Sequence, residues 1–233
     1  GSMASARAMA TRCCCPPESW PGYLFSWARK APRSSRLLAR AAPSSGPGPR
    51  TYAVAVRSRV DADPEAHLLA AGHALKAESP CMVIEAPVPV RAVDDRVRLA
   101  RLATPDDVRE AVALSAEAYA TLGLPVEEAH AMLARAGGWL ESDVAGFIAR
   151  IDGRPAAMAL TLFSEGAAGV YWVATLPEAR GRGLGEVCAA LATNAGFARG
   201  ARVVTLQASP MGEPIYTRLG YRTVDRLRRY RPA

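Results

Sequence analysis

A glycine-rich loop of nine residues, EARGRGLGE at 178–186, separates the apolar run AGVYWVATL from a stretch with helical periodicity. Three of its residues are glycines and two are arginines. Glycines between a strand and a helix let the backbone approach an anion, and the N–H groups and dipole of the helix N-terminus favour a phosphate there. The loop therefore predicts a phosphate site at a strand–helix junction.

Two common phosphate loops do not fit these residues. The dinucleotide pattern G-x-G-x-x-G, read from Gly181, places Glu186 where the third glycine belongs, and no acid follows about 20 residues later, near Thr205. The Walker A pattern needs a lysine and a hydroxyl residue after its last glycine, and here Glu186 and Val187 follow Gly185. A Rossmann domain and a P-loop NTPase are both excluded.

The residues from Arg96 onward predict a regular series of elements. Thr104, Pro105 and Asp107 form a capping box at the start of a helix, and Gly137 and Gly138 end a second one. Asp152-Gly153 indicates a hairpin turn. The resulting order is β-α-α-β-β-β-α-β-α-β. We expect an α/β (α+β) fold with a mixed, mostly antiparallel central sheet and helices on both faces.

The chain divides into three segments. Residues 1–50 are a basic segment that ends in a Pro/Gly/Ser-rich stretch, with residues 1–3 typical of a tag scar. Residues 51–90 predict a strand, a helix that ends at Gly72 and a second strand within CMVIEA. Residues 96–233 form the expected catalytic domain.

The net charge of +7 lies entirely in the first segment. Residues 1–50 hold eight basic residues and one acid, whereas the rest of the chain holds 21 of each. The first segment fits a transit peptide, a nucleic-acid-binding arm or a proteome rich in Ala and Arg. We do not expect nucleic acid as a partner of the neutral remainder.

The cysteines indicate neither a disulfide framework nor a metal site. Three of the five are consecutive, at 13–15, no C-x-x-C accompanies them, and the three histidines lie far off in sequence. Free thiols are typical of a cytoplasmic protein. No run of about 18 apolar residues occurs, so we expect no membrane association.

The pattern that does fit the loop is R-x-x-G-x-G, from Arg180 to Gly185, after a strand with Thr175 and Pro177 before the arginine. It resembles the signature of the GNAT superfamily of acyl-CoA N-acyltransferases. A second segment, LQASPMGEPIYTRLGYRTV at 206–224, is similar to the family's second motif. That motif is a strand, a small polar residue, then a helix with a tyrosine followed by L-G-[FY]; the matching residues are Ser209, Tyr216 and Leu219-Gly220-Tyr221.

The resemblance covers residues 96 to about 231 and implies a function. A GNAT enzyme would transfer an acetyl group from acetyl-CoA, its co-substrate, by direct attack of a primary amine on the thioester. Tyr216 would be the general acid that protonates the departing thiolate, and a backbone N–H near Val173 would meet the oxyanion. The implied cofactor-binding residues are Val173, Thr175, Arg180, Gly181, Arg182, Gly183, Leu184, Gly185 and Ser209.

Simpler roles for three of these residues stay open. Tyr216 could only pack on an amphipathic helix, Ser209 could only cap that helix, and Arg182 could only be a solvated charge. The residue that accepts the amine proton is also open, with four glutamates as alternatives: Glu117, Glu141, Glu165 and Glu178.

The resemblance leaves two further functions as alternatives. The chain could be a catalytically silent acyl-CoA-binding module, or its first 50 residues could bind nucleic acid. The expected partner of an active enzyme is an amine-bearing small molecule or a protein acceptor, and a homodimer is left open. Residues 51–90 have the pattern of a degenerate GNAT-like half-domain without a second active site.

Overall fold

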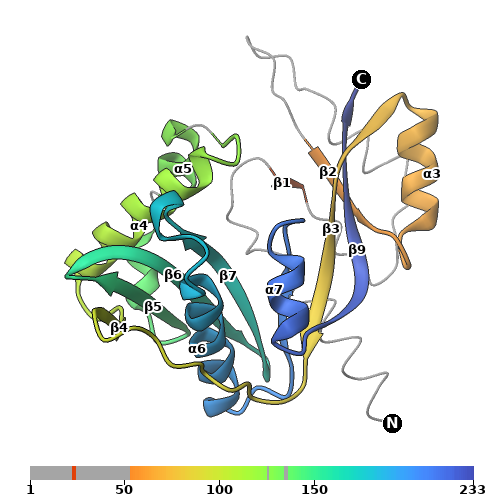
Figure 1. The fold of residues 1–233 in the computed structure, drawn as a ribbon. Coiled ribbons are helices and arrows are strands. Elements are labelled where there is room, and N and C mark those ends of the chain that lie inside the picture. The colour runs from red at the N-terminus through yellow and green to blue at the C-terminus, as the bar shows by residue number, and fades with distance from the viewer. Residues whose placement is uncertain (1–22, 25–52, 125, 134–135) are drawn as a thin grey trace.

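The chain forms one nine-stranded sheet in the order β1-β2-β9-β3-β8-β7-β6-β5-β4 in the computed structural model (Figure 1). The structure describes residues 23–24, 53–124, 126–133 and 136–233. Apart from β1 (Tyr23–Leu24), the basic segment of residues 1–50 lies outside the described residues, and so do the three consecutive cysteines. The predicted fold class and the element order from residue 96 are both confirmed.

An antiparallel meander makes up one end of the sheet. It consists of β4 (Val97–Arg101), β5 (Val144–Ile151), β6 (Arg154–Ser164) and β7 (Ala167–Thr175). Asp152 and Gly153 both have positive φ, 50° and 81°, as a tight hairpin turn between β5 and β6 requires. The hairpin prediction is confirmed.

Helices cover both faces of the meander. Helix α4 (Pro105–Ala120) starts with the predicted capping box, and its Ser115 hydroxyl lies 2.8 Å from Met158 Sδ on β6. Helix α6 (Leu184–Ala198) lies on the opposite face, where Cys188 approaches the backbone of Ala149. Ala149 pairs with Ala157, and Ile148 with Met158, so successive side chains alternate between the two helices.

Shorter elements complete this half of the chain. Helix α5 (Val126–Leu133) is followed by the 3-10 helix η1 (Ala136–Leu140), so the second predicted helix ends earlier than its sequence pattern indicates. A second 3-10 turn, η2 (Pro177–Ala179), leads into the glycine loop.

The other half of the sheet combines both ends of the chain. It contains β2 (Ala53–Arg57), β3 (His73–Ile84), β8 (Val204–Gln207) and β9 (Arg222–Pro232). Strand β3 pairs antiparallel with β8 on one side and with β9 on the other. It begins at His73, eight residues before the predicted strand, because the long β9 supplies pairing partners along its whole length. Strand β3 therefore lies inside the sheet of the expected catalytic domain.

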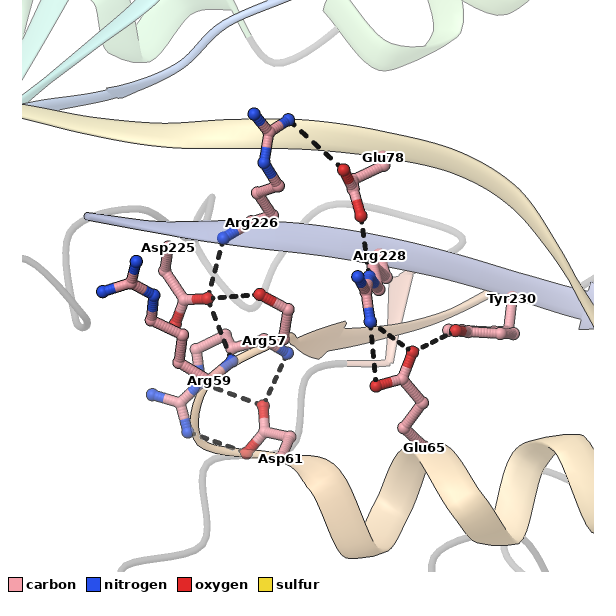
Figure 2. Close-up of polar contacts among 10 residues, drawn as sticks. Arg57, Arg59, Asp61, Glu65, Glu78, Asp225, Arg226, Arg228 and Tyr230 are labelled. Carbon is pink, nitrogen blue, oxygen red and sulfur yellow. Dashed lines mark hydrogen bonds and ion pairs between the residues drawn. The ribbon is translucent and has the colours of Figure 1, made fainter. Parts of the chain in front are cut away.

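Helix α3 (Ala62–Ala70) packs on the outer face of this half, where Leu68 is buried between Val56 and Tyr230. Figure 2 shows the polar contacts that join the same elements. Arg228 on β9 donates to Glu78 on β3 at 2.7 Å and to Glu65 on α3 at 3.0 Å, and the Tyr230 hydroxyl also contacts Glu65. These contacts hold residues 53–84 against the C-terminal strand. Descent of this region from a second domain stays a prediction.

Candidate active site

A cleft opens where β7 and β8 separate. The two parallel strands pair only at Ala168 with Val204 and at Gly169 with Thr205. Beyond Gly169, β7 continues to Thr175 with its β8-side edge unpaired by β8. An edge that no strand covers can pair with an extended ligand that adds as a strand.

A bulge in β7 marks the point of separation. The register between β6 and β7 shifts between the pairs Leu160–Tyr171 and Met158–Ala174, which sets Trp172 and Val173 together against the single residue 159 of β6. Trp172 has φ of 51°, a backbone conformation that non-glycine residues rarely adopt. The strain falls beside the position that was predicted to meet the oxyanion.

A cavity of about 710 Å³ fills the cleft. Its lining includes nine of the ten sequence-predicted site residues, and the tenth, Arg182, lines a smaller hollow with Arg91, Asp94 and Arg96 instead. The nine residues come from β7, the glycine loop, the start of α6, the turn after β8 and helix α7 (Glu213–Arg218). They are Val173, Thr175, Arg180, Gly181, Gly183, Leu184, Gly185, Ser209 and Tyr216.

The glycine loop has the geometry of an anion site. Gly181 and Gly183 have φ of 77° and 76°, and α6 begins directly after Gly183. Residues with positive φ ahead of a helix turn successive N–H groups toward one concavity. A Cβ on Gly185 would lie 2.7 Å from Thr175 Oγ1, so only glycine permits the loop to lie this close to β7.

Two arginines, Arg180 and Arg91, surround the glycine loop in a way that the motif did not predict. The Arg180 guanidinium donates to Thr121 Oγ1 at 2.6 Å, to Thr175 O at 3.3 Å and to Ala118 O at 3.5 Å, so it holds the end of α4 against β7. Arg91, which carries no sequence signal, lies so close to Gly183 that a Cβ there would be 2.4 Å from its Nη1. Arg91 supplies a positive charge that the motif assigned to the loop itself.

Tyr216 lies on α7 and faces the cavity from the side opposite β7. Its side chain is buried, with its ring 5.9 Å from that of Tyr221 in an edge-on arrangement. Burial raises the pKa of the Tyr216 hydroxyl above its usual value, so the phenol keeps its proton. Tyr221 is held by a hydroxyl–hydroxyl hydrogen bond of 2.7 Å with Thr193 on α6.

Ser209 sits at the turn that leads into α7. Its Oγ accepts a hydrogen bond from Gly212 N at 3.1 Å. The simpler role of Ser209 as a turn-forming residue is therefore present in the structure, alongside its place in the cavity wall. A contact between Ser209 and a cofactor stays a prediction.

Tyr119 and Trp172 form the floor beside the bulge. The Tyr119 hydroxyl donates to Val173 O at 3.4 Å, and the two rings lie edge to face, 5.2 Å apart. Burial raises the pKa of Tyr119 to about 12. Neither the position of Tyr119 nor its contact with Val173 could be inferred from the glycine motif.

Few acidic groups face the cavity. None of the four glutamates considered as a proton acceptor (Glu117, Glu141, Glu165 and Glu178) belongs to its described lining. Glu186 does, but its carboxylate is paired with Arg218 at 3.2 Å.

Among residues 53–124, 126–133 and 136–233, no group of three His, Cys, Asp or Glu side chains could hold a metal ion.

The far wall of the cavity consists of residues that sequence reasoning missed. Ser79 from β3, Gln207 from β8 and Arg229 from β9 all belong to the lining. Only the insertion of β3 between β8 and β9 brings these side chains to one face. A sequence motif could not have identified them, since they lie on three separate strands.

A splayed mixed sheet with an anion-binding glycine loop at the separation defines the architecture of acyl-CoA-dependent acyltransferases. The chain belongs to the GNAT acetyltransferase family: the model of the acetyltransferase (GNAT) domain matches residues 90–213. This confirms the resemblance on which the transferase prediction rests.

Solved structures with the same fold agree with that assignment. A GCN5-related N-acetyltransferase from Kribbella flavida is 23% identical, with a TM-score of 0.62 over 78% of this chain and 68% of that one. Another GCN5-related N-acetyltransferase, from Sphaerobacter thermophilus, is 18% identical, with a TM-score of 0.62 over 84% of this chain and 64% of that one.

A tandem GNAT protein from the clavulanic acid biosynthesis pathway is 18% identical, with a TM-score of 0.59 over 78% of this chain and 64% of its own length. No curated protein matches the chain. No helix in the described part of the chain is long and apolar enough to cross a membrane.

Proposed function

We propose that the protein is an acetyl-CoA-dependent N-acetyltransferase in which a primary amine attacks the thioester directly. The observation that carries this proposal is that the glycine loop, the unpaired edge of β7 and the Tyr216 ring line one continuous cavity. These three features support a binding site for the pyrophosphate, a strand edge for the pantetheine arm and a proton donor within one cavity.

The residues present fit acetyl-CoA as co-substrate. The N–H groups from Gly181 to Gly185 and the charge of Arg91 suit a pyrophosphate, and the close approach at Gly185 requires the absence of a Cβ. The main chain of Val173 and Thr175 is the edge that an extended pantetheine arm would pair with. Bound acetyl-CoA supplies the activated acetyl group as a thioester.

Two groups of the protein take part in the proposed reaction, a backbone N–H near Val173 and the Tyr216 hydroxyl. The amine nitrogen forms a bond to the thioester carbonyl carbon, and a backbone N–H near Val173 stabilises the oxyanion. The C–S bond then breaks, and Tyr216 donates its proton to the thiolate sulfur. The bonded nitrogen releases its surplus proton to water as the amide forms, and water returns a proton to the Tyr216 phenolate. Burial keeps Tyr216 protonated, so its hydroxyl has a proton to donate at neutral pH.

The amine nitrogen must arrive without its extra proton. Among the described residues, the cavity lining has several arginines and a single carboxylate, which is paired. Both desolvation and nearby positive charge lower the pKa of an ammonium group. The neutral amine is thus the favoured bound form, and its proton leaves to water. A dedicated carboxylate base is not needed.

Thiol release tests the proposal. The full chain is incubated with acetyl-CoA and a broad panel of primary amines, and free CoA is measured with a thiol reagent. In parallel, thermal unfolding with and without acetyl-CoA reports binding. We expect amine-dependent release and a raised melting temperature. Tight acetyl-CoA binding without turnover of any amine would favour a silent acyl-CoA-binding module, and no thermal shift at millimolar acetyl-CoA would end both ideas.

A further inference from the structure

The far wall of the cavity contains the positively charged Arg229, which has no role in the proposed reaction with acetyl-CoA. Side chains alternate along β9, so that Arg228 and Tyr230 face α3 while Leu227 and Arg229 face the cavity. Arg229 is half-buried and lies opposite Ala55 on β2 and Ala77 on β3. Its two cross-strand neighbours are therefore too small and too apolar to neutralise it.

Three other arginines of the same strand have carboxylate partners, and Arg229 has none among the described residues. Arg222 pairs with Glu85, Arg226 with Glu78, and Arg228 with both Glu65 and Glu78. No carboxylate oxygen of a described residue lies within 4.0 Å of the Arg229 guanidinium nitrogens, so Arg229 has no ion pair among these residues. A half-buried guanidinium with no counterion gains free energy when an anion binds it.

Two neutral groups lie on the same wall. Gln207 lies directly opposite Cys81 on β3, two residues from Ser79, and both Gln207 and Ser79 line the cavity. Gln207 Nε2 is shielded from solvent and has no hydrogen-bond partner among the described residues. An amide in this state is stabilised when a ligand oxygen supplies the missing acceptor.

The charge balance of the wall selects among amines. Glu186 is the one carboxylate in the described lining, and it is paired with Arg218 at the glycine-loop side. In the proposed reaction the amine attacks near Val173, and Arg229 lies on the wall of the same cavity, where the rest of the acceptor can contact it. A second ammonium group would meet a like charge there, whereas a carboxylate would meet an opposite one.

We propose that the acceptor is a small amine that also carries a carboxylate, and that Arg229 binds this carboxylate with Gln207 and Ser79 as neutral donors. The inference rests on the proposed N-acetyltransferase function. It predicts selectivity for amino acids or other amino carboxylates and rejection of polyamines. A cavity of about 710 Å³ accommodates the end of the pantetheine arm and an acceptor of this size together.

Pairs of amines that differ in charge but have nearly the same shape test whether the enzyme recognises the carboxylate. The panel contains α-, β- and γ-amino carboxylates, the carboxamide of each, and 1,4-diaminobutane. For the wild-type chain we expect kcat/KM for the preferred carboxylate to exceed that of its carboxamide by about tenfold or more. The diamine should be the poorest substrate of the panel.

The variant Arg229→Gln tests the residue. It should lower kcat/KM for the preferred carboxylate about tenfold through KM and leave the value for its carboxamide nearly unchanged. The control is Arg231→Gln, on the same strand, at an exposed position outside the cavity lining. Equal melting temperatures and equal acetyl-CoA binding establish that both variants are folded.

The outcomes distinguish this inference from the function beneath it. Turnover that prefers a carboxamide or the diamine, or a carboxylate preference that survives Arg229→Gln, overturns the inference and leaves the enzyme function standing. If no amine releases CoA, the enzyme function fails, and the carboxylate site is tested by the melting temperature with CoA present. A rise with amino carboxylates in the wild type that is absent in Arg229→Gln supports the site, and no rise overturns it.

Discussion

The guanidinium of Arg180 donates to the Thr121 hydroxyl at 2.6 Å, which ties the first residue of the glycine motif to the end of helix α4. The same side chain reaches Thr175 O on β7 at 3.3 Å. The loop, the helix and the strand that line the cleft are thus held together by one arginine. Its contribution to cofactor binding should come from ordering these elements as well as from charge.

Replacing Arg180 should therefore weaken acetyl-CoA binding. We expect Arg180→Ala to raise KM for acetyl-CoA about tenfold. Thr121→Val removes one hydrogen bond of Arg180 and no charge, so it should raise KM by a smaller factor. Steady-state kinetics at varied acetyl-CoA measure both. Arg182→Ala is the contrast in the same loop, since Arg182 lies outside the main cavity. An equal loss from Arg182→Ala would mean that charge alone matters.

Gly185 is expected to tolerate no side chain. A Cβ there would lie 2.7 Å from Thr175 Oγ1, so Gly185→Ala should push the loop away from β7 and destabilise the fold by about 1–3 kcal/mol. The double variant Gly185→Ala, Thr175→Ala removes the opposing hydroxyl and should recover part of the loss. Urea unfolding of the four chains in a double-mutant cycle measures the coupling. Purely additive effects would contradict the close contact.

Tyr216 should matter for turnover more than for stability. Tyr216→Phe removes the protonated hydroxyl and keeps the ring that packs edge-on against Tyr221. We expect kcat to fall about 100-fold or more with an unchanged KM for acetyl-CoA. Tyr221→Phe is the matched control: it removes the hydrogen bond to Thr193, whose hydroxyl keeps its bond to Ala189 O, and should cost about 1 kcal/mol of stability while kcat is largely kept. The reverse pattern would remove Tyr216 from the chemistry.

Asp107 should give the fold a measurable sensitivity to acid. Its carboxylate accepts hydrogen bonds from Ala103 N, the Arg150 guanidinium and Thr104, and these lower its pKa to about 2. Because the folded pKa is below the unfolded value of about 3.9, the stabilisation is complete above about pH 4 and is lost as the pH falls toward and through about 2. Asp107→Asn should therefore be less stable than wild type at pH 7, and the difference should shrink between about pH 4 and 2. Chemical unfolding at several pH values measures it, and a difference that does not depend on pH would contradict the assigned pKa.

The pairing of β3 predicts the effect of shortening the chain. A chain that begins at residue 85 would lack β3 and leave the facing edges of β8 and β9 without partners. Exposed strand edges promote aggregation, so we expect this chain not to give a folded monomer by size-exclusion chromatography and circular dichroism. A chain that begins at residue 51 keeps β2, α3 and β3 and should unfold cooperatively. Cooperative unfolding of the shorter chain would instead make residues 51–84 an accessory segment.

Local patterns in the sequence determined most of the secondary structure. The capping box at Thr104, the Asp152-Gly153 turn and the glycines around 181–185 each act through contacts within a few residues, and each is present in the structure. The same residues carry the family signature. The class of protein and the glycine-loop end of its cleft could therefore be predicted from short stretches of the chain.

The tertiary structure alone decided the far wall of the cleft. Strand β3 pairs with β8 and β9, which lie more than 100 residues away in sequence, and the strand pattern of residues 73–84 specifies a buried face but no partner. Ser79, Gln207 and Arg229 meet only through that pairing, and Arg180 turns toward Thr121 only once α4 has docked on β7. The sequence by itself determined the shape of the glycine loop, because backbone geometry is local. The surroundings of the acceptor depend on long-range strand order, which only the assembled sheet defines.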